Sequence, residues 1–173
     1  MGQDSTGVDN VRVFVPHAAM SAATMLACSA NSIVMGKHSF LGPIDPQFIV
    51  QTELGRASVA AHAIEEQFNL AKKEILADQG VLPAWLPILR QYGPALIIQC
   101  QLARQLSEQL VGDWLTRYMF APAPKKKGAA IAKQLANHAN FKSHNRFIDR
   151  AQVQTLGLTV SELEADQPLQ DTV

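Results

Sequence analysis

Residues 11–47 read VRVFVPHAAMSAATMLACSANSIVMGKHSFLGPIDPQ, and this stretch decides the fold. Val11–Val15 alternates apolar and polar residues, is rich in β-branched side chains and stops at Pro16, which is typical of a buried strand. Small and helix-favouring residues follow, so a helix is predicted to begin at or next to Ser21. Ser32–Met35 (SIVM) predicts a second strand. The stretch therefore indicates a strand, a sharp turn, a helix and another strand.

The turn before the predicted helix leaves two roles open for Ser21. A residue there lies beside backbone N–H groups that have no partner within the helix. Its hydroxyl could attack a carbonyl carbon while the Ala22 N–H holds the developing negative charge. Serine is also among the best N-cap residues, so the local pattern is equally typical of a cap.

The quoted stretch and three later segments together resemble the serine dehydrogenase proteinase family; the segments are QYGPALIIQC, LVGDWLTRYMF and FKSHNRFIDRAQVQTLGLTVSELEADQPLQDTV. This family is a branch of the serine peptidases with the Clp protease and crotonase fold, related to signal peptide peptidase A. The resemblance implies an α/β fold with a helix-rich C-terminal half. It also implies a serine-type peptidase that cleaves peptide bonds through an acyl-enzyme, with Ser21 as the nucleophile and the Ala22 N–H as an oxyanion donor.

Two further residues are candidates for the site. Asp45 stands where Clp proteases carry the histidine base, so it is a candidate orienting group, although an Asx-type turn before Pro46 explains it equally. His144 stands where the resembling family has a histidine, so it is a candidate base or only a hydrogen-bonding residue that holds the C-terminal segment. His62 could also act as a base, but a position on a helix surface explains it as well.

The resembling family differs from this sequence before Val11. Its members carry a glycine-rich loop that supplies a second oxyanion donor, and no such loop precedes Val11 here. We therefore expect an N-terminally incomplete Clp and crotonase-like fold that hydrolyses unfolded protein poorly unless another polypeptide supplies the loop. The alternative function is a catalytically silent homologue that serves as an oligomeric assembly or interaction module.

Composition excludes several classes of partner. Lys and Arg number 15, as do Asp and Glu, so no charge excess favours nucleic acid. The two cysteines, Cys28 and Cys100, lie in apolar helical patterns and are expected to be buried thiols in a reducing compartment. We expect no cofactor and no metal site. We also expect a peptide or unfolded protein substrate, a cytoplasmic location and at most a peripheral association with membranes, because no apolar run is long enough to span one.

The rest of the chain is predicted in four segments: a flexible lead-in over 1–10, a core over 11–120, a hinge over 121–127 and a C-terminal helical segment over 128–173. Within the core, 57–78 and 95–120 predict amphipathic helices. Residues 80–94 (GVLPAWLPILRQYGP) predict an irregular apolar loop around Trp85, and residues from Glu162 onward are expected to fray. The Trp85 loop, the long helix and an uncovered sheet edge before Val11 favour a homo-oligomer.

Overall fold

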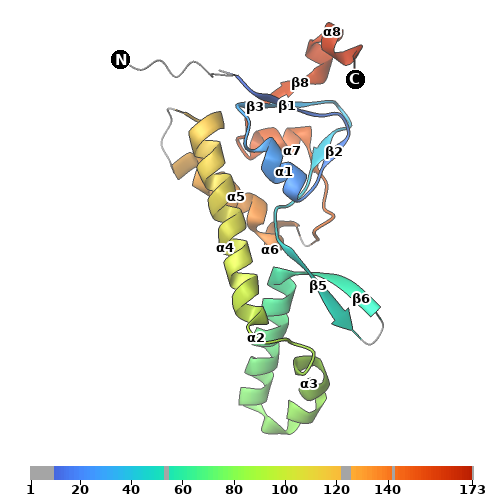
Figure 1. The fold of residues 1–173 in the computed structure, drawn as a ribbon, viewed down its shortest axis with the longest axis vertical. Coiled ribbons are helices and arrows are strands. Elements are labelled where there is room, and N and C mark those ends of the chain that lie inside the picture. Colours follow the sequence, from blue (N-terminus) through green and yellow to red (C-terminus); the bar gives the residue numbers. More distant parts are fainter. Residues whose placement is uncertain (1–9, 53–54, 122–125, 142, 173) are drawn as a thin grey trace. The chain divides into compact units, whose positions relative to one another are not determined.

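The computed structural model describes residues 10–52, 55–121, 126–141 and 143–172, and its contacts divide the chain into two units (Figure 1). The first unit comprises Met1–Ile44 and Glu108–Val173, and the second comprises Asp45–Ser107. Helices and strands both contribute, so the chain has an α/β composition. None of the helices in the described ranges is both long enough and apolar enough to cross a bilayer.

Two small sheets form the first unit. The first has the order β1-β3-β8 and is parallel throughout; its strands are β1 (Arg12–Val15), β3 (Ser32–Met35) and β8 (Val160–Glu162). The second has the order β2-β4-β7; its strands are β2 (Ala18–Ala19), β4 (Phe40–Leu41) and β7 (Ile148–Asp149). In this second sheet β2 is parallel to β4, whereas β4 is antiparallel to β7. Within the described residues β1 is thus an edge strand.

Short helices connect and cover these strands. They are α1 (Ala22–Ala27), the C-terminal end of α4 (Leu96–Trp114) with its π-helical continuation η2 (Leu115–Met119), α5 (Lys126–Ala136), α6 (His138–Phe141), α7 (Arg150–Thr155), η3 (Leu163–Ala165) and α8 (Gln167–Gln170). α7 begins with a capping box: the Gln152 N–H donates to Asp149 Oδ1 at 2.8 Å, and the Asp149 N–H donates to Gln152 Oε1 at 3.1 Å.

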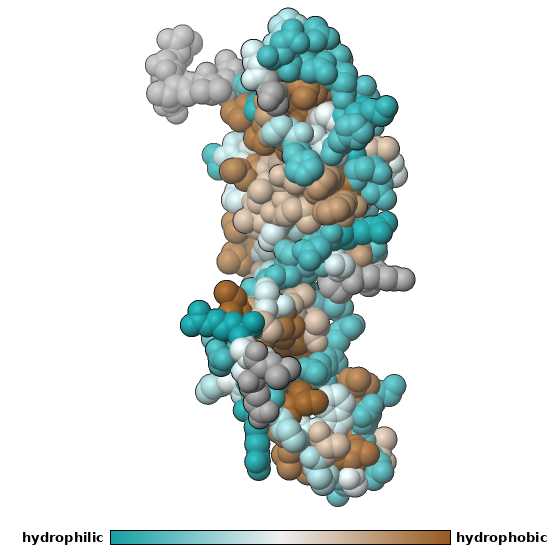
Figure 2. Space-filling view, turned by 90° about the vertical axis from the view of Figure 1, so that its right-hand side faces the viewer, coloured by the Kyte–Doolittle hydropathy of each residue, from teal (hydrophilic) through white to brown (hydrophobic). Residues whose placement is uncertain are grey.

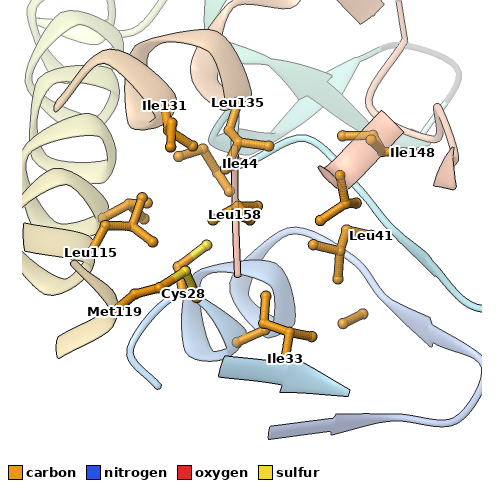
Figure 3. Close-up of a cluster of buried hydrophobic side chains, with 14 of the residues drawn as sticks. Cys28, Ile33, Leu41, Ile44, Leu115, Met119, Ile131, Leu135, Ile148 and Leu158 are labelled. Atoms are coloured by element: carbon orange, nitrogen blue, oxygen red, sulfur yellow. The ribbon is translucent and has the colours of Figure 1, made fainter. Parts of the chain in front are cut away.

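The core of the first unit is one continuous apolar cluster between the sheets and the helices (Figure 3). Its buried members include Cys28, Ile33, Leu41, Leu115, Leu135, Ile148 and Leu158. Close backbone packing brings α5 to the end of α4, because a Cβ on Gly128 would lie 2.7 Å from the Gly112 carbonyl oxygen and 2.5 Å from Thr116 Oγ1. Only glycine permits this approach, which makes the core dense at that point.

The second unit is built from a hairpin and helices. Its elements are β5 (Gln47–Thr52), β6 (Gly55–Ala60), α2 (Ala61–Ala77), η1 (Gln79–Val81), α3 (Leu82–Leu89) and the start of α4. Its buried apolar cluster consists of Ala61, Ile64 and Cys100. An ion pair joins α4 to α2, since Arg104 Nη1 donates to Glu65 Oε2 at 2.8 Å.

The structure confirms the strands predicted at Val11–Val15 and Ser32–Met35, the helix that begins next to Ser21 and the long helix after residue 95. The predicted loop over 80–94 is wrong, because α3 forms there. Pro83 occupies the first turn of α3, where its missing N–H has no acceptor in any case. Residues 57–60 belong to β6 rather than to the predicted helix.

The C-terminal end also differs from the prediction. The described residues from Glu162 onward do not fray: Glu162 ends β8, which pairs with β3 through Ile33 and Val160, and η3 and α8 follow it. The lead-in over 1–9 and most of the Pro-rich hinge, 122–125, lie outside the described residues. The predicted four-segment division remains a prediction, whereas the contacts group the chain as the two units given above.

Candidate functional site

Ser21 lies between β2 and α1 in a backbone conformation that serine rarely adopts. Its φ is 52° and its ψ is −115°, and the Ala23 N–H donates to the Met20 carbonyl at 2.9 Å. These angles and this hydrogen bond are those of a type II′ turn with Ser21 at the position that glycine dominates. Among the described non-glycine residues, only Ser21 and Ala95 have a positive φ. The turn at Ser21 is therefore strained.

The Ser21 side chain does not cap α1. No hydrogen bond joins its Oγ to the first turn of the helix, although Ser21 occupies the N-cap position, and the residue is half-buried. The Ala22 N–H comes first in α1, where no helix carbonyl is available to accept from it. The predicted strand-to-helix turn is thus confirmed, and a cap does not account for the serine.

Thr24 and Gly42 pack directly beneath this turn. Thr24 is fully buried, and its Oγ1 lies 2.6 Å from the Ala19 carbonyl oxygen, 2.9 Å from the Gly42 carbonyl oxygen and 3.1 Å from the Gly42 nitrogen. A Cβ on Gly42 would lie 2.5 Å from the Met20 Cε atom. The residues before and after Ser21 are thereby tied to the end of β4.

His144 lies in a turn that leads into β7. The register of the second sheet places Ala19 beside Leu41 and Leu41 beside Ile148, so the chain leaves β2 at the same end at which it enters β7. Phe147 packs on Phe40 with ring centroids 4.0 Å apart, which fixes the end of the His144 segment against β4. Ser21 therefore follows β2, and His144 precedes β7, at the same end of one sheet.

The other two candidates lie in the second unit. Asp45 is buried at its start, outside the unit that carries Ser21. His62 lies on α2, where its Nε2 is 3.2 Å from Glu66 Oε1. This pairing one helical turn away accounts for His62 without a catalytic role.

A charged cluster closes the far end of β3. Arg150 Nη1 donates to Glu164 Oε2 at 2.6 Å and to the Met35 carbonyl at 3.1 Å, while Glu164 also accepts from the Lys37 N–H. The hydrogen bond from Arg150 lowers the pKa of Glu164 from 4.5 to about 2. The cluster joins the segment after β8 to the end of β3 and to the turn that follows β3.

The cysteines have no features of a reactive site. Burial raises the pKa of Cys28 to about 12 and also raises the pKa of Cys100, so both thiols are poor nucleophiles. Both are unpaired and buried. In the part of the chain that the structure describes, no three His, Cys, Asp or Glu side chains gather where they could hold a metal ion.

Sequence reasoning missed Thr24 and Gly42. Thr24 carries a usable signal, because a β-branched hydroxyl residue is an unusual choice in an alanine-rich helix three positions after a candidate nucleophile. Gly42 has no such signal, because its close contact with Met20 has no signature in the sequence.

Comparison with known proteins gives two kinds of match. Two uncharacterized proteins of Methanocaldococcus jannaschii are similar to short parts of the chain: one is 53% identical over 36 residues and the other 46% identical over 35. These alignments cover 21% and 20% of this chain and only 13% and 12% of the two relatives. No solved structure gives a significant match.

A family model described as "ClpP-like SDH-type serine proteinase" matches residues 7–84. This segment includes Ser21 with the turn around it, Asp45 and the hairpin, whereas His144 lies beyond it. The match supports the family that the motifs in residues 11–47 resemble: residues 7–84 are similar to the ClpP-like SDH-type serine proteinases.

Proposed function

We propose that the chain carries the nucleophile of a serine-type peptidase that cleaves peptide bonds through an acyl-enzyme. Ser21 Oγ attacks the carbonyl carbon of the substrate, and the Ala22 N–H donates to the oxyanion that forms. The observation that carries this proposal is the strained, uncapped conformation of Ser21 at a strand-to-helix turn. Serine hydrolases use such turns to present the hydroxyl to the substrate and the next backbone N–H to the oxyanion.

His144 is our proposed general base. It precedes β7 at the sheet end where the chain leaves β2, and a neutral imidazole nitrogen can accept a proton. Catalytic hydrogen bonds often form only in the substrate complex, and we propose that His144 accepts the Ser21 proton there. The role of Asp45 as an orienting group rests on the resemblance of residues 11–47 to the family and stays a prediction.

Labelling with a fluorophosphonate probe tests the nucleophile. We expect slow labelling of Ser21, in keeping with the poor hydrolysis expected of the chain by itself, no labelling of Ser21→Ala, and labelling of Ser29→Ala at the wild-type rate. Ser29 is a matched control because it belongs to the same turn-rich segment, but its Oγ donates to the Leu26 carbonyl at 2.7 Å. Unlabelled wild-type protein, or equal labelling of wild type and Ser21→Ala, would refute the proposal.

A second candidate function, assembly of several copies, is favoured by the surface of α4. Ile98, Leu102 and Leu106 recur every fourth residue and are 54–58% exposed. Figure 2 shows how such apolar side chains lie at the surface among hydrophilic ones. The neighbours of Leu102 on this face, Gln99 and Gln105, carry no charge, so two copies of the face can pair without repulsion.

Sedimentation velocity tests this assembly. We propose that the α4 face contacts a second copy, so the double variant Leu102→Gln, Leu106→Gln should sediment at a lower mass than wild type. Leu76→Gln on α2 is a control, because Leu76 is 76% exposed and belongs to a different helix. A monomeric wild type at tens of micromolar would exclude assembly; an interface normally buries about 800 Å² per partner.

A further inference from the structure

The hydroxyl of Thr24 is the meeting point of three chain segments beneath the candidate nucleophile. It approaches the end of β2 at the Ala19 carbonyl, and it approaches both backbone groups of Gly42 after β4. Thr24 itself belongs to α1, and its side chain is wholly buried. A polar group in such a place requires a partner for its hydrogen and for its lone pairs.

The available hydrogens fix the pattern of this junction. A hydroxyl has one hydrogen to donate and two lone pairs to accept. The shortest contact, 2.6 Å, makes the Ala19 carbonyl the main acceptor of the Thr24 hydrogen. The Gly42 N–H is then shared between the Ala19 carbonyl at 3.0 Å and Thr24 Oγ1 at 3.1 Å. The Gly42 N–H therefore bonds directly to the Ala19 carbonyl, and Thr24 Oγ1 joins both residues to α1.

Ser21 lies inside the loop that this junction closes. The chain runs from Ala19 through Met20 and Ser21 to Thr24, and the hydroxyl returns from Thr24 to Ala19. Within this loop the Ala23 N–H closes the turn on the Met20 carbonyl. Gly42 also lies close to Met20, since a Cβ on Gly42 would lie 3.3 Å from the Met20 Cα atom. A backbone that costs energy persists only where its surroundings fix it in this way.

We propose that Thr24 is a positioning residue for the nucleophile: its hydroxyl holds the Ser21 turn in the conformation that directs Oγ and the Ala22 N–H toward one substrate carbonyl. This rests on the proposed function of Ser21. Without the hydroxyl, the loop from Ala19 to Thr24 loses its closing bond, and Ser21 relaxes toward a negative φ. Both Oγ and the Ala22 N–H then move, and a displacement of about 1 Å can lower a reaction rate roughly hundredfold.

Three variants separate the hydroxyl from the packing of the residue. Thr24→Val keeps the branched shape and removes the hydroxyl, whereas Thr24→Ser keeps the hydroxyl and removes the methyl group. Ser39→Ala is a matched control in the same unit, since the buried Ser39 hydroxyl also joins two backbone groups, accepting from the Gly36 N–H at 2.9 Å and donating to the Pro16 carbonyl at 3.2 Å. That bridge lies away from the Ser21 turn.

The first measurement is the second-order rate of fluorophosphonate acylation, taken well below the unfolding midpoint of each variant. We expect Thr24→Val to lose about a hundredfold in rate, and Thr24→Ser and Ser39→Ala to keep most of it. Equal rates for wild type and Thr24→Val, or an equal loss in Thr24→Val and Ser39→Ala, would overturn the proposal, because stability alone would then explain the result.

The second measurement is amide hydrogen exchange, which does not depend on activity. The Ala23 N–H donates to the Met20 carbonyl and the Met25 N–H donates to the Ser21 carbonyl, so both report on the turn. We expect both amides to exchange faster in Thr24→Val and at the wild-type rate in Thr24→Ser. Unchanged exchange in Thr24→Val contradicts the positioning role of Thr24, whereas absent acylation of wild type contradicts only the proposed function of Ser21.

Discussion

The two units of the chain bury their apolar residues to very different degrees. In the described residues, the cluster of the first unit holds 18 buried side chains, whereas that of the second holds three. The second unit instead leaves large apolar groups exposed, among them Leu70, Leu76, Ile98 and Leu102. A dense core restrains the backbone that packs on it, and the strained turn at Ser21 belongs to the unit that has such a core.

Because their apolar cores differ, the two units are expected to open at different free-energy costs. Segments with few buried contacts open locally at a small free-energy cost, while a core opens only when the domain unfolds. The hairpin and helices of the second unit are thus expected to open locally more readily than the first unit. The predictions below are ordered from the largest expected effect to the smallest.

Each of the two apolar cores contains one cysteine, so the reactivity of each thiol measures how readily its core opens. Cys28 lies in the first and Cys100 in the second, and neither is exposed. We expect a thiol reagent to modify Cys100 more than about tenfold faster than Cys28 under native conditions, because local opening of the second unit is enough to expose it. Rates measured on the single variants Cys28→Ala and Cys100→Ala give each thiol separately. Equal rates would mean that the units open together.

Two glycines test how closely each unit is packed. Gly128→Ala places a methyl group against the backbone of α4, so it should lower the free energy of unfolding by about 1–3 kcal/mol. Gly93→Ala is the matched change in the second unit, where nothing lies within 4 Å of the added carbon, and its effect should stay within about 0.5 kcal/mol. Chemical denaturation measures both. A larger cost at Gly93 would reverse the comparison.

Glu164 gives the first unit a modest dependence on pH. Its pKa falls from 4.5 to about 2 in the folded chain, mainly through the hydrogen bond from Arg150. A lowered carboxyl pKa stabilises the fold above pH 4.5, and this stabilisation is lost as the pH falls toward about 2. The group is exposed to solvent, so the effect should be small. Wild type should lose stability more steeply than Glu164→Gln in this window, and identical pH profiles would contradict the assignment.

The sequence predicted those parts of the fold that depend on local pattern. The strand VRVFV, the strand SIVM and the helix after Ser21 have clear periodicity or turn signals, and all three form. α3 has no clear signal because prolines usually indicate a break in a helix, although Pro83 here occupies the first turn. The order from Glu162 onward has no local signal either, because β8 is defined by pairing with Ile33 and its neighbours, far away in the chain.

The candidate site was predictable in part, because the position of the turn at Ser21 also depends on local pattern. The motif around Ser21 gave the position of the turn, and the family match supports it. The positive φ of Ser21 could not be predicted, because it depends on contacts of Thr24 and Met20 with Gly42, which belongs to a later loop. The roles of His144 and Asp45 remain predictions.

The central claim is that the first unit holds Ser21 in a strained conformation for catalysis. The most direct measurement is the difference in the free energy of unfolding between Ser21→Gly and Ser21→Ala, since both lack the hydroxyl but only glycine accepts a positive φ without strain. We predict that the glycine variant is more stable than the alanine variant by about 1 kcal/mol or more. An alanine variant as stable as the glycine variant would show that the turn carries no strain and would contradict the claim.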